Sequence, residues 1–111
     1  MQQFIASDGA RITYRDQGEG RPILLLHGLM ATGGFFRHQM ELARDFRLIS
    51  VDLRGHGASE AGEDCPTVGR LAADISALIT ALNLTDAVGI GWSMGASVLF
   101  DLLTAPVAER F

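Results

Sequence analysis

A serine flanked by glycines is the residue of this chain with the clearest chemistry. Residues 91–95, here called the serine turn, read Gly-Trp-Ser-Met-Gly, with an apolar run before them and a helical pattern after them. A strand–turn–helix junction of this kind holds a serine hydroxyl clear of the backbone, where it can act as a nucleophile. The bend forces Ser93 to positive φ, and only glycine fits two residues before and after it. We therefore predict that Ser93 is catalytic.

Backbone amides near this serine would stabilise the negative charge that forms on an attacked carbonyl oxygen. Met94 follows Ser93 in the first turn of a predicted helix, so we expect its amide to lie at the positive end of the helix dipole. His27-Gly28 follows an earlier apolar run, and we expect this turn to lie beside the serine and to offer the Leu29 amide. Leu29 and Met94 are thus the predicted oxyanion-binding residues, whereas His27 is predicted to be structural.

A third polar stretch, residues 52–59, reads Asp-Leu-Arg-Gly-His-Gly-Ala-Ser. Asp52 and Arg54 are expected to pair and to pin this loop near the strand ends. The less favoured alternative makes His56 or Asp52 a triad partner of Ser93. Cys65 is predicted to be a small buried or loop residue, because no histidine or carboxylate is spaced to activate its thiol.

Residues 89–95 also spell G-x-G-x-x-x-G, which is close to a dinucleotide-binding fingerprint. That fingerprint belongs to the first strand–helix turn of its domain, whereas two apolar strands precede this one. Trp92 would also crowd a pyrophosphate. No cofactor is expected, and no metal either, because the three histidines and the single cysteine lack metal-ligand spacing.

The segments that carry these residues are predicted to alternate between strands and helices. Strands are predicted at 4–5, 12–14, 23–26, 48–51 and 87–90, with an Asp8-Gly9 hairpin turn between the first two. Apolar spacing predicts helices over 35–44, 71–82 and about 93–104, with Thr67 capping the second helix and Asn83 ending it. The last three strands are continuously apolar, which is typical of strands covered on both faces. This order predicts an α/β fold, a three-layer sandwich around a mostly parallel sheet.

The composition narrows the class of protein. The chain has 111 residues, 48% of them hydrophobic and 20% charged, which suits one domain at most. Its net charge of -4 provides no basic stripe for nucleic acid. The longest strongly apolar run, residues 23–26, is far shorter than the ~20 residues of a membrane span. With a lone cysteine and no secretory signal, we expect a cytoplasmic protein without nucleic-acid or membrane partners.

Four stretches of the chain occur together, in this order, in one known family. They are Gly18-x-Gly20-x-Pro22, His27-Gly28, the loop 52–59 and the serine turn. Together they resemble the amino-terminal half of α/β-hydrolase fold enzymes of the serine esterase, lactonase and C–C hydrolase type. The resemblance implies hydrolysis of a small ester, lactone or related carbonyl substrate without a cofactor. A serine at position 93 disfavours relatives with aspartate there, which look like dehalogenases and epoxide hydrolases.

The chain departs from that family after the nucleophile. In the fold the acid and the histidine follow the nucleophile, but no histidine follows Ser93, and Asp101 is expected to point away from it. Residues 1–111 therefore look like the amino-terminal portion of one domain, truncated after the nucleophile helix and inactive in isolation. The expected partner is the missing carboxy-terminal half, or a second copy bound at the exposed strand 87–90. The alternatives are a non-catalytic truncated relative or binding scaffold, and a nucleotide-binding module.

Overall fold

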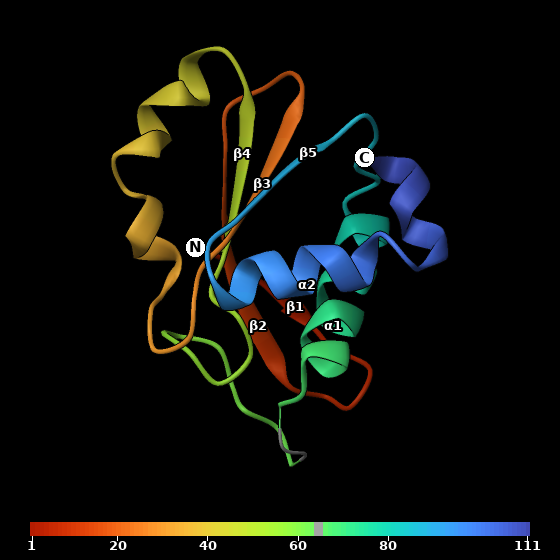
Figure 1. Cartoon of the computed structure of the whole chain (residues 1–111). Helices are drawn as coiled ribbons and strands as arrows, with labels where there is room; N and C mark the ends of the chain where they lie inside the picture. The colour runs from red at the N-terminus through yellow and green to blue at the C-terminus, as the bar shows by residue number, and fades with distance from the viewer. Residues whose placement is uncertain (64–65) are drawn as a thin grey trace.

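A single five-stranded sheet forms the centre of the computed structural model, which describes residues 1–63 and 66–111 (Figure 1). The spatial order of the strands is β1-β2-β4-β3-β5. Their bounds are β1 (Gln2–Ile5), β2 (Arg11–Gln17), β3 (Pro22–Leu26), β4 (Arg47–Val51) and β5 (Val88–Gly91). The prediction for Cys65 lies outside the described residues.

The sheet is mixed. The three strands predicted from continuous apolar runs are parallel, since β3 pairs in that sense with both β4 and β5. β2 pairs antiparallel with β1 through the predicted hairpin, and antiparallel with β4. The α/β class is confirmed, and the antiparallel pairings come from the amino-terminal hairpin, which adds to the edge of the parallel part.

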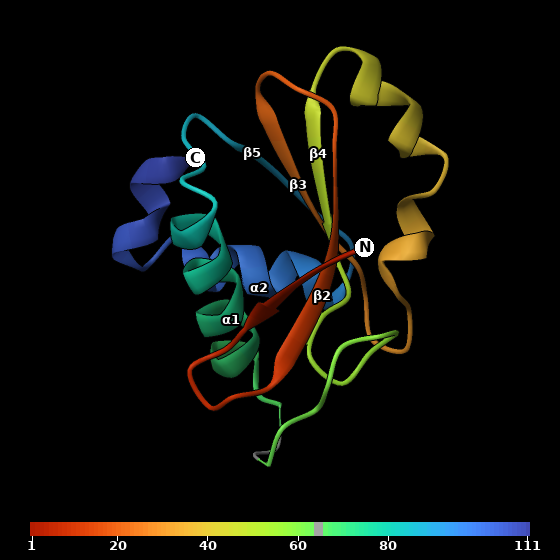
Figure 2. The same ribbon diagram turned by 180° about the vertical axis from the view of Figure 1, so that it is seen from behind.

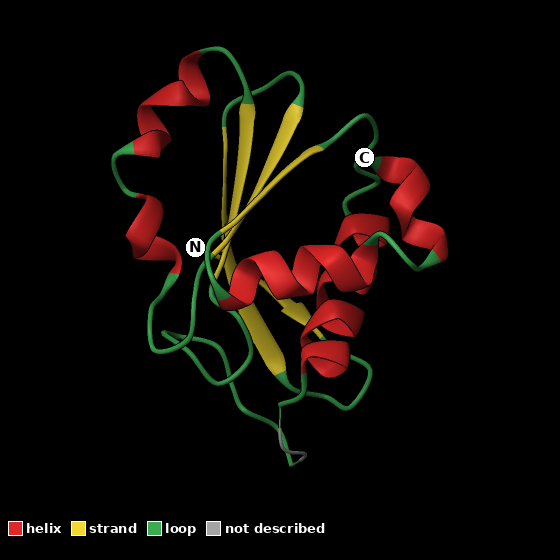
Figure 3. Ribbon diagram, viewed as in Figure 1, coloured by secondary structure: helices red, strands yellow, loops and turns green. Residues whose placement is uncertain are grey.

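Helices cover both faces of the sheet, which confirms the three layers (Figures 2 and 3). On one face lie α1 (Val68–Ala81), α2 (Met94–Leu102) and the short 3-10 helix η3 (Pro106–Arg110). On the other face lie two 3-10 helices, η1 (Gly33–Phe36) and η2 (Gln39–Arg44). Leu24 and Leu26 of β3 pack toward the first group, and Ile23 and Leu25 toward the second. All five residues of β3 are buried, as its unbroken apolar run predicts.

The two longer helices follow the sequence signals. Thr67 caps α1 as predicted, because its hydroxyl accepts a hydrogen bond from the Arg70 amide at 3.1 Å. Asn83, just beyond α1, has a φ of 51°, in the left-handed region where helices commonly end. The helix predicted from about Ser93 is α2, which begins at Met94.

The helix predicted over 35–44 is wrong in type. The structure has two separate 3-10 turns there instead of one α-helix. η1 begins with Gly33 and Gly34, just before the predicted range, and each disfavours an α-helix by about 1 kcal/mol relative to alanine. The predicted apolar face is nevertheless used, since Phe36, Met40 and Ala43 pack on the sheet.

Parallel pairing brings three loops to one edge of the sheet. Leu26 at the end of β3 lies beside Val51 at the end of β4 and beside Gly91 at the end of β5. The turn at 27–29, the loop 52–59 and the serine turn therefore leave the sheet at the same edge. In open α/β sheets, ligands bind outside this carboxyl edge.

Candidate active site at the carboxyl edge of the sheet

Ser93 stands in the sharp turn between β5 and α2. Its backbone has φ 53° and ψ -114°, and the helix begins with the next residue. The predicted positive φ is therefore present, at a cost of order 1–3 kcal/mol for a residue with a side chain. The Ser93 side chain is exposed and makes no capping hydrogen bond to the helix.

The two glycines of the serine turn are required by close backbone approach. A Cβ at Gly91 would lie 2.5 Å from the carbonyl carbon of Gly95 and 2.6 Å from the amide nitrogen of Ala96. A Cβ at Gly95 would collide with the carbonyl group of Leu26 at the end of β3. The sequence expectation that side chains at these two positions would clash with the strand and the helix is thus confirmed.

The His27-Gly28 turn lies beside the serine turn. A Cβ at Gly28 would lie 2.7 Å from the indole ring of Trp92 and 3.3 Å from the Cβ of Ser93. The Trp92 amide also donates to the Leu26 carbonyl at 3.0 Å. Leu29 follows Gly28 directly, so both predicted oxyanion-binding residues, Leu29 and Met94, flank the serine. In the part of the chain that the structure describes, neither of their amides has a hydrogen-bond acceptor.

Trp92 stacks on an aromatic side chain of η1. Its ring and that of Phe35 are nearly parallel, with centroids 4.4 Å apart. Phe35 in turn meets the buried Phe36 edge-on, at 5.1 Å. Trp92 and Phe35 remain 47% and 43% exposed, so the stack presents an apolar surface next to Ser93.

His27 is fully buried and holds the turn beneath this site. Its Nε2 accepts a hydrogen bond from the Leu53 amide at 2.9 Å, so the ring carries its proton on Nδ1. Nδ1–H then donates to the Gly28 carbonyl at 2.7 Å. Burial lowers the pKa of His27, so the neutral ring is favoured. The predicted structural role is confirmed.

Asp52 and His56, the less favoured triad candidates, have hydrogen-bond partners other than Ser93. Asp52 accepts the Gly33 amide at 2.7 Å and the Ala58 amide at 3.0 Å. The His56 Nδ1 lies 3.0 Å from the Arg54 carbonyl. Among the described residues, no hydrogen bond joins a histidine or a carboxylate to the Ser93 hydroxyl.

The predicted Asp52–Arg54 pair is wrong. Arg54 makes two hydrogen bonds to Asp74 on α1, at 2.7 and 2.9 Å, and two to Asp8 in the hairpin turn, at 2.7 and 3.0 Å. These bonds raise the pKa of Arg54, and they lower the pKa of Asp8 to about 2. Asp52 instead accepts the amide of Gly33 in η1 and that of Ala58 in its own loop. The overlooked signal is Asp74 itself, an acid inside the apolar stripe of α1, because a buried carboxylate requires a partner.

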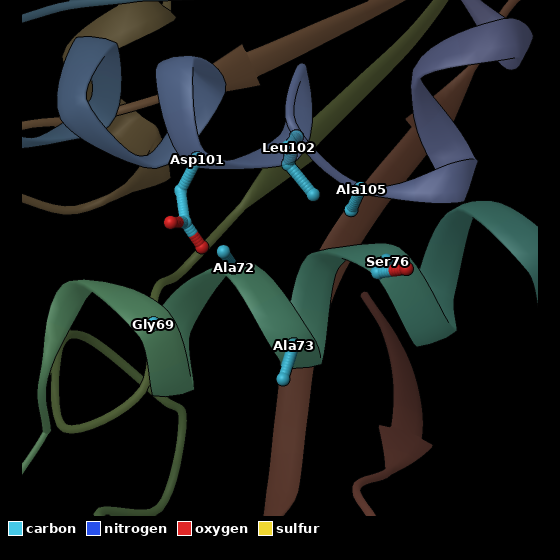
Figure 4. Close-up of a pocket in the computed structure, with 7 residues that line it drawn as sticks. All are labelled: Gly69, Ala72, Ala73, Ser76, Asp101, Leu102 and Ala105. Carbon is cyan, nitrogen blue, oxygen red and sulfur yellow. The ribbon is translucent and has the colours of Figure 1, made fainter.

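Asp101 lies behind the serine turn, as expected. It faces α1 across a shallow pocket of about 220 Å³ lined by small side chains (Figure 4). Figure 4 shows its carboxylate directed toward Ala72 of that helix. Asp101 is therefore placed away from Ser93.

The glycines shared with the dinucleotide pattern serve packing. A Cβ at Gly89 would lie 2.8 Å from the Leu99 side chain and 3.1 Å from the Phe111 ring, so this glycine lets α2 and the chain end approach β5.

Residues 1–63 and 66–111 contain no group of three or more histidine, cysteine or acidic side chains placed to hold a metal. In the same residues, no helix combines the length and the apolar character needed to cross a membrane.

Comparison with known proteins identifies the family. Residues 21–104 match the family described as the alpha/beta hydrolase fold. The AB hydrolase superfamily protein YisY of Bacillus subtilis (strain 168) is 42% identical over 85 residues, which are 75% of this chain and 32% of that protein. A non-heme haloperoxidase of Rhodococcus erythropolis is 38% identical over 92 residues, 81% of this chain and 34% of that protein.

Solved structures agree with these relatives. An esterase from Exiguobacterium antarcticum superposes with a TM-score of 0.92 at 33% identity, covering 97% of this chain and 41% of that one. Esterases and epoxide hydrolases both occur among the similar structures. The chain spans about a third of the length of the curated relatives it matches. Because the family match covers residues 21–104 and the solved structures share its fold, with the strained serine at the edge of the sheet, the chain belongs to the α/β-hydrolase family.

Proposed function

We propose that Ser93 is the nucleophile of a serine hydrolase that acts on an ester, a lactone or a related carbonyl compound. The observation that carries this proposal is an exposed serine held at positive φ, beside the Leu29 and Met94 amides, for which residues 1–63 and 66–111 provide no acceptor. A strained residue persists only where its surroundings over-determine it, and such residues cluster at active sites.

In the proposed reaction, the Ser93 oxygen attacks the substrate carbonyl carbon while a general base takes the hydroxyl proton. The Leu29 and Met94 amides donate hydrogen bonds to the resulting oxyanion. The intermediate collapses to an acyl-enzyme as the leaving alcohol accepts the proton, and water then releases the acid by the same steps. The base and its orienting acid are assigned to the carboxy-terminal part of the fold that the longer relatives contain.

His27 supports this reaction by orienting the Leu29 amide. The Gly28 carbonyl accepts from His27 at 2.7 Å and from the Ala31 amide at 3.1 Å, which fixes the plane of the Gly28–Leu29 peptide. In a trans peptide the N–H points opposite to the C=O, and the described residues contain no cis peptide bond. The Leu29 N–H is therefore turned away from the buried imidazole.

The edge of the sheet at β5 is a candidate surface for binding a partner. β5 is the last strand in the sheet order, and Ile90 on it is 42% exposed. We propose that this edge takes a further strand from the carboxy-terminal part of the fold, and that a second copy occupies it when the chain is alone. Light scattering of the isolated chain should detect dimers or larger species, and a monodisperse monomer at high concentration would contradict this.

A chimera tests the function. Residues 1–111 would replace the matching segment of the Exiguobacterium antarcticum esterase, and hydrolysis of p-nitrophenyl esters would be measured. We expect activity that Ser93→Ala abolishes and that Ser97→Ala retains, since Ser97 is exposed one turn along the same helix. A folded chimera without activity would favour the binding-scaffold alternative. The isolated chain should react with a fluorophosphonate far more slowly than the chimera, because no histidine or carboxylate among its described residues is hydrogen-bonded to Ser93.

A further inference from the structure

The basic residues of this chain fall into two groups by their partners. All nine are arginines. Most of them bind acceptors within the protein: Arg11 with Glu60, Arg21 with Asp86, Arg47 with Asp16, Arg54 and Arg70 with Asp8 and Asp74, and Arg110 with Asn83. Among the described residues, Arg15, Arg37 and Arg44 form no ion pair. In a chain with a net charge of -4, unpaired cations are the exception.

Two of these three arginines line the same pocket. It has a volume of about 210 Å³ and lies between β2 and the η1–η2 segment. Its lining residues are Arg15, Gln17, Gly33, Gly34, Arg37 and Met40, and none of them is acidic. Arg15 and Gln17 come from alternate positions of β2, and therefore from the same face of that strand.

The two guanidinium groups approach neighbouring glycines of η1, Gly33 and Gly34. The Arg15 Nη1 lies 3.3 Å from the position that a Cβ would take on Gly33. The Arg37 Nη1 lies 3.5 Å from the Gly34 carbonyl oxygen, a contact at the upper limit of a hydrogen bond. The guanidinium groups thus keep most of their donors free, and the Gln17 amide adds further donors at the rim.

Two carboxylates near the pocket, those of Asp52 and Asp16, already accept hydrogen bonds within the protein. Asp52 is buried beside Gly33, but its two oxygens accept the Gly33 and Ala58 amides. Asp16, next to Arg15 in sequence, binds Arg47 through two hydrogen bonds of 2.7 and 2.9 Å. The lining of the pocket therefore combines two positive charges with free donors and contains no acidic side chain, and the buried Asp52 lies behind Gly33.

We propose that this pocket binds a small oxyanion, a phosphate or a dicarboxylate. Planar guanidinium groups bind such anions through paired, charge-assisted hydrogen bonds, and two of them match a doubly charged ligand. This site is separate from Ser93 and does not depend on the proposed hydrolase activity. Phe35 of η1 stacks on Trp92, so the bound anion and the serine turn share one connecting segment.

The test is a titration of the whole chain with inorganic phosphate and, separately, with malonate, at constant ionic strength. Calorimetry gives the affinity, and the arginine side-chain signals in NMR spectra identify the contacts. We expect saturable binding of at least one anion, with the Arg15 and Arg37 signals shifting together. The anion with the higher affinity shows whether phosphate or a dicarboxylate is the preferred ligand.

Arginine variants decide whether the pocket is responsible. Arg15→Gln and Arg37→Gln should each weaken binding roughly tenfold, the scale of one lost charge-assisted interaction. Arg44→Gln is the matched control, an exposed and unpaired arginine outside the pocket, and it should bind like the parent chain. Spectra of each variant report whether it is folded. Absence of saturable binding to both anions, or equal loss in all three variants, would overturn the proposal.

Discussion

The loops that follow β4 and β5 leave the sheet at the same edge, but they treat their polar groups in opposite ways. In the loop after β4, Asp52 accepts two backbone amides, and Ser59 accepts the Thr13 amide at 2.8 Å. Arg54 of that loop is buried against two carboxylates. In the turn after β5, Ser93 is exposed and strained, and the following amide has no acceptor among the described residues.

This difference separates scaffold from site. A polar group whose hydrogen bonds are already satisfied stabilises the fold, but it has little left to offer a substrate. The groups around Ser93 are held in place by glycine contacts and backbone bonds, so the serine hydroxyl and the adjacent amides stay available. Both loops carry histidine, serine or aspartate, and only their bonding in three dimensions shows which loop can do chemistry.

The largest expected loss of stability comes from a substitution in the loop 52–59. Arg54→Met would leave Asp74, whose side chain is 3% exposed, with only the longer 3.3 Å contact to Arg70. We expect the free energy of unfolding in urea to fall by about 3 kcal/mol, as for a broken buried ion pair. Arg11→Met is the matched control, because its pair with Glu60 is exposed and contributes about 0–1 kcal/mol. Equal losses in both variants would show that Arg54 is not a structural anchor.

Replacing a closely packed glycine should give the next largest loss of stability. Gly95→Ala places a methyl group against the Leu26 carbonyl and should destabilise the chain by about 2 kcal/mol or more. In α1, Gly69 has no neighbouring atom closer than 3.8 Å to its Cβ position. Gly69→Ala should therefore increase the stability by about 0.5–1 kcal/mol through helix propensity. Thermal unfolding of both variants checks the opposite signs, and a Gly95→Ala chain as stable as the parent would contradict the close approach.

Backbone strain at Ser93 predicts that removing its side chain stabilises the fold by a smaller amount than Gly95→Ala destabilises it. Ser93→Gly removes the side chain from a residue at positive φ, and we expect a gain of up to about 1 kcal/mol in unfolding free energy. The same change at Ser97, inside α2, should cost about 0.5–1 kcal/mol. If both substitutions destabilise equally, the backbone at Ser93 stores no strain.

The smallest expected effect is the change in stability at acid pH that comes from the Asp8–Arg54 pair. The Arg54 guanidinium lowers the pKa of Asp8 from 3.8 to about 2. A carboxyl with a lower pKa in the folded state stabilises it above the unfolded pKa, and this contribution is lost as the pH falls from about 4 toward 2. Denaturant unfolding should therefore show a decline over that window that Asp8→Asn makes shallower. Glu19→Gln in the exposed loop after β2 should leave the decline as it is in the parent chain.

Most of the strands and helices, and the serine turn, were predictable from local sequence, whereas the helix type over 35–44 was not. Each rests on neighbouring residues: an unbroken apolar run makes β3 a two-sided strand, and Thr67 caps the helix that it precedes. The spacing of Gly91, Ser93 and Gly95 likewise encodes one tight bend, because the steric conflict lies within a few residues and at the strand beside them. These features were predictable because their causes are local or are written in a short motif.

Which charged side chains pair depends on how distant segments pack. Arg54 is 20 residues from Asp74 and 46 from Asp8, so the choice between these acids and the nearby Asp52 depends on how α1 and the hairpin pack over the loop. The pocket of Arg15 and Arg37 likewise joins β2 to the segment after β3. Ion pairs lack the periodicity of apolar burial, since a long side chain can reach any of several partners, and only packing selects among them.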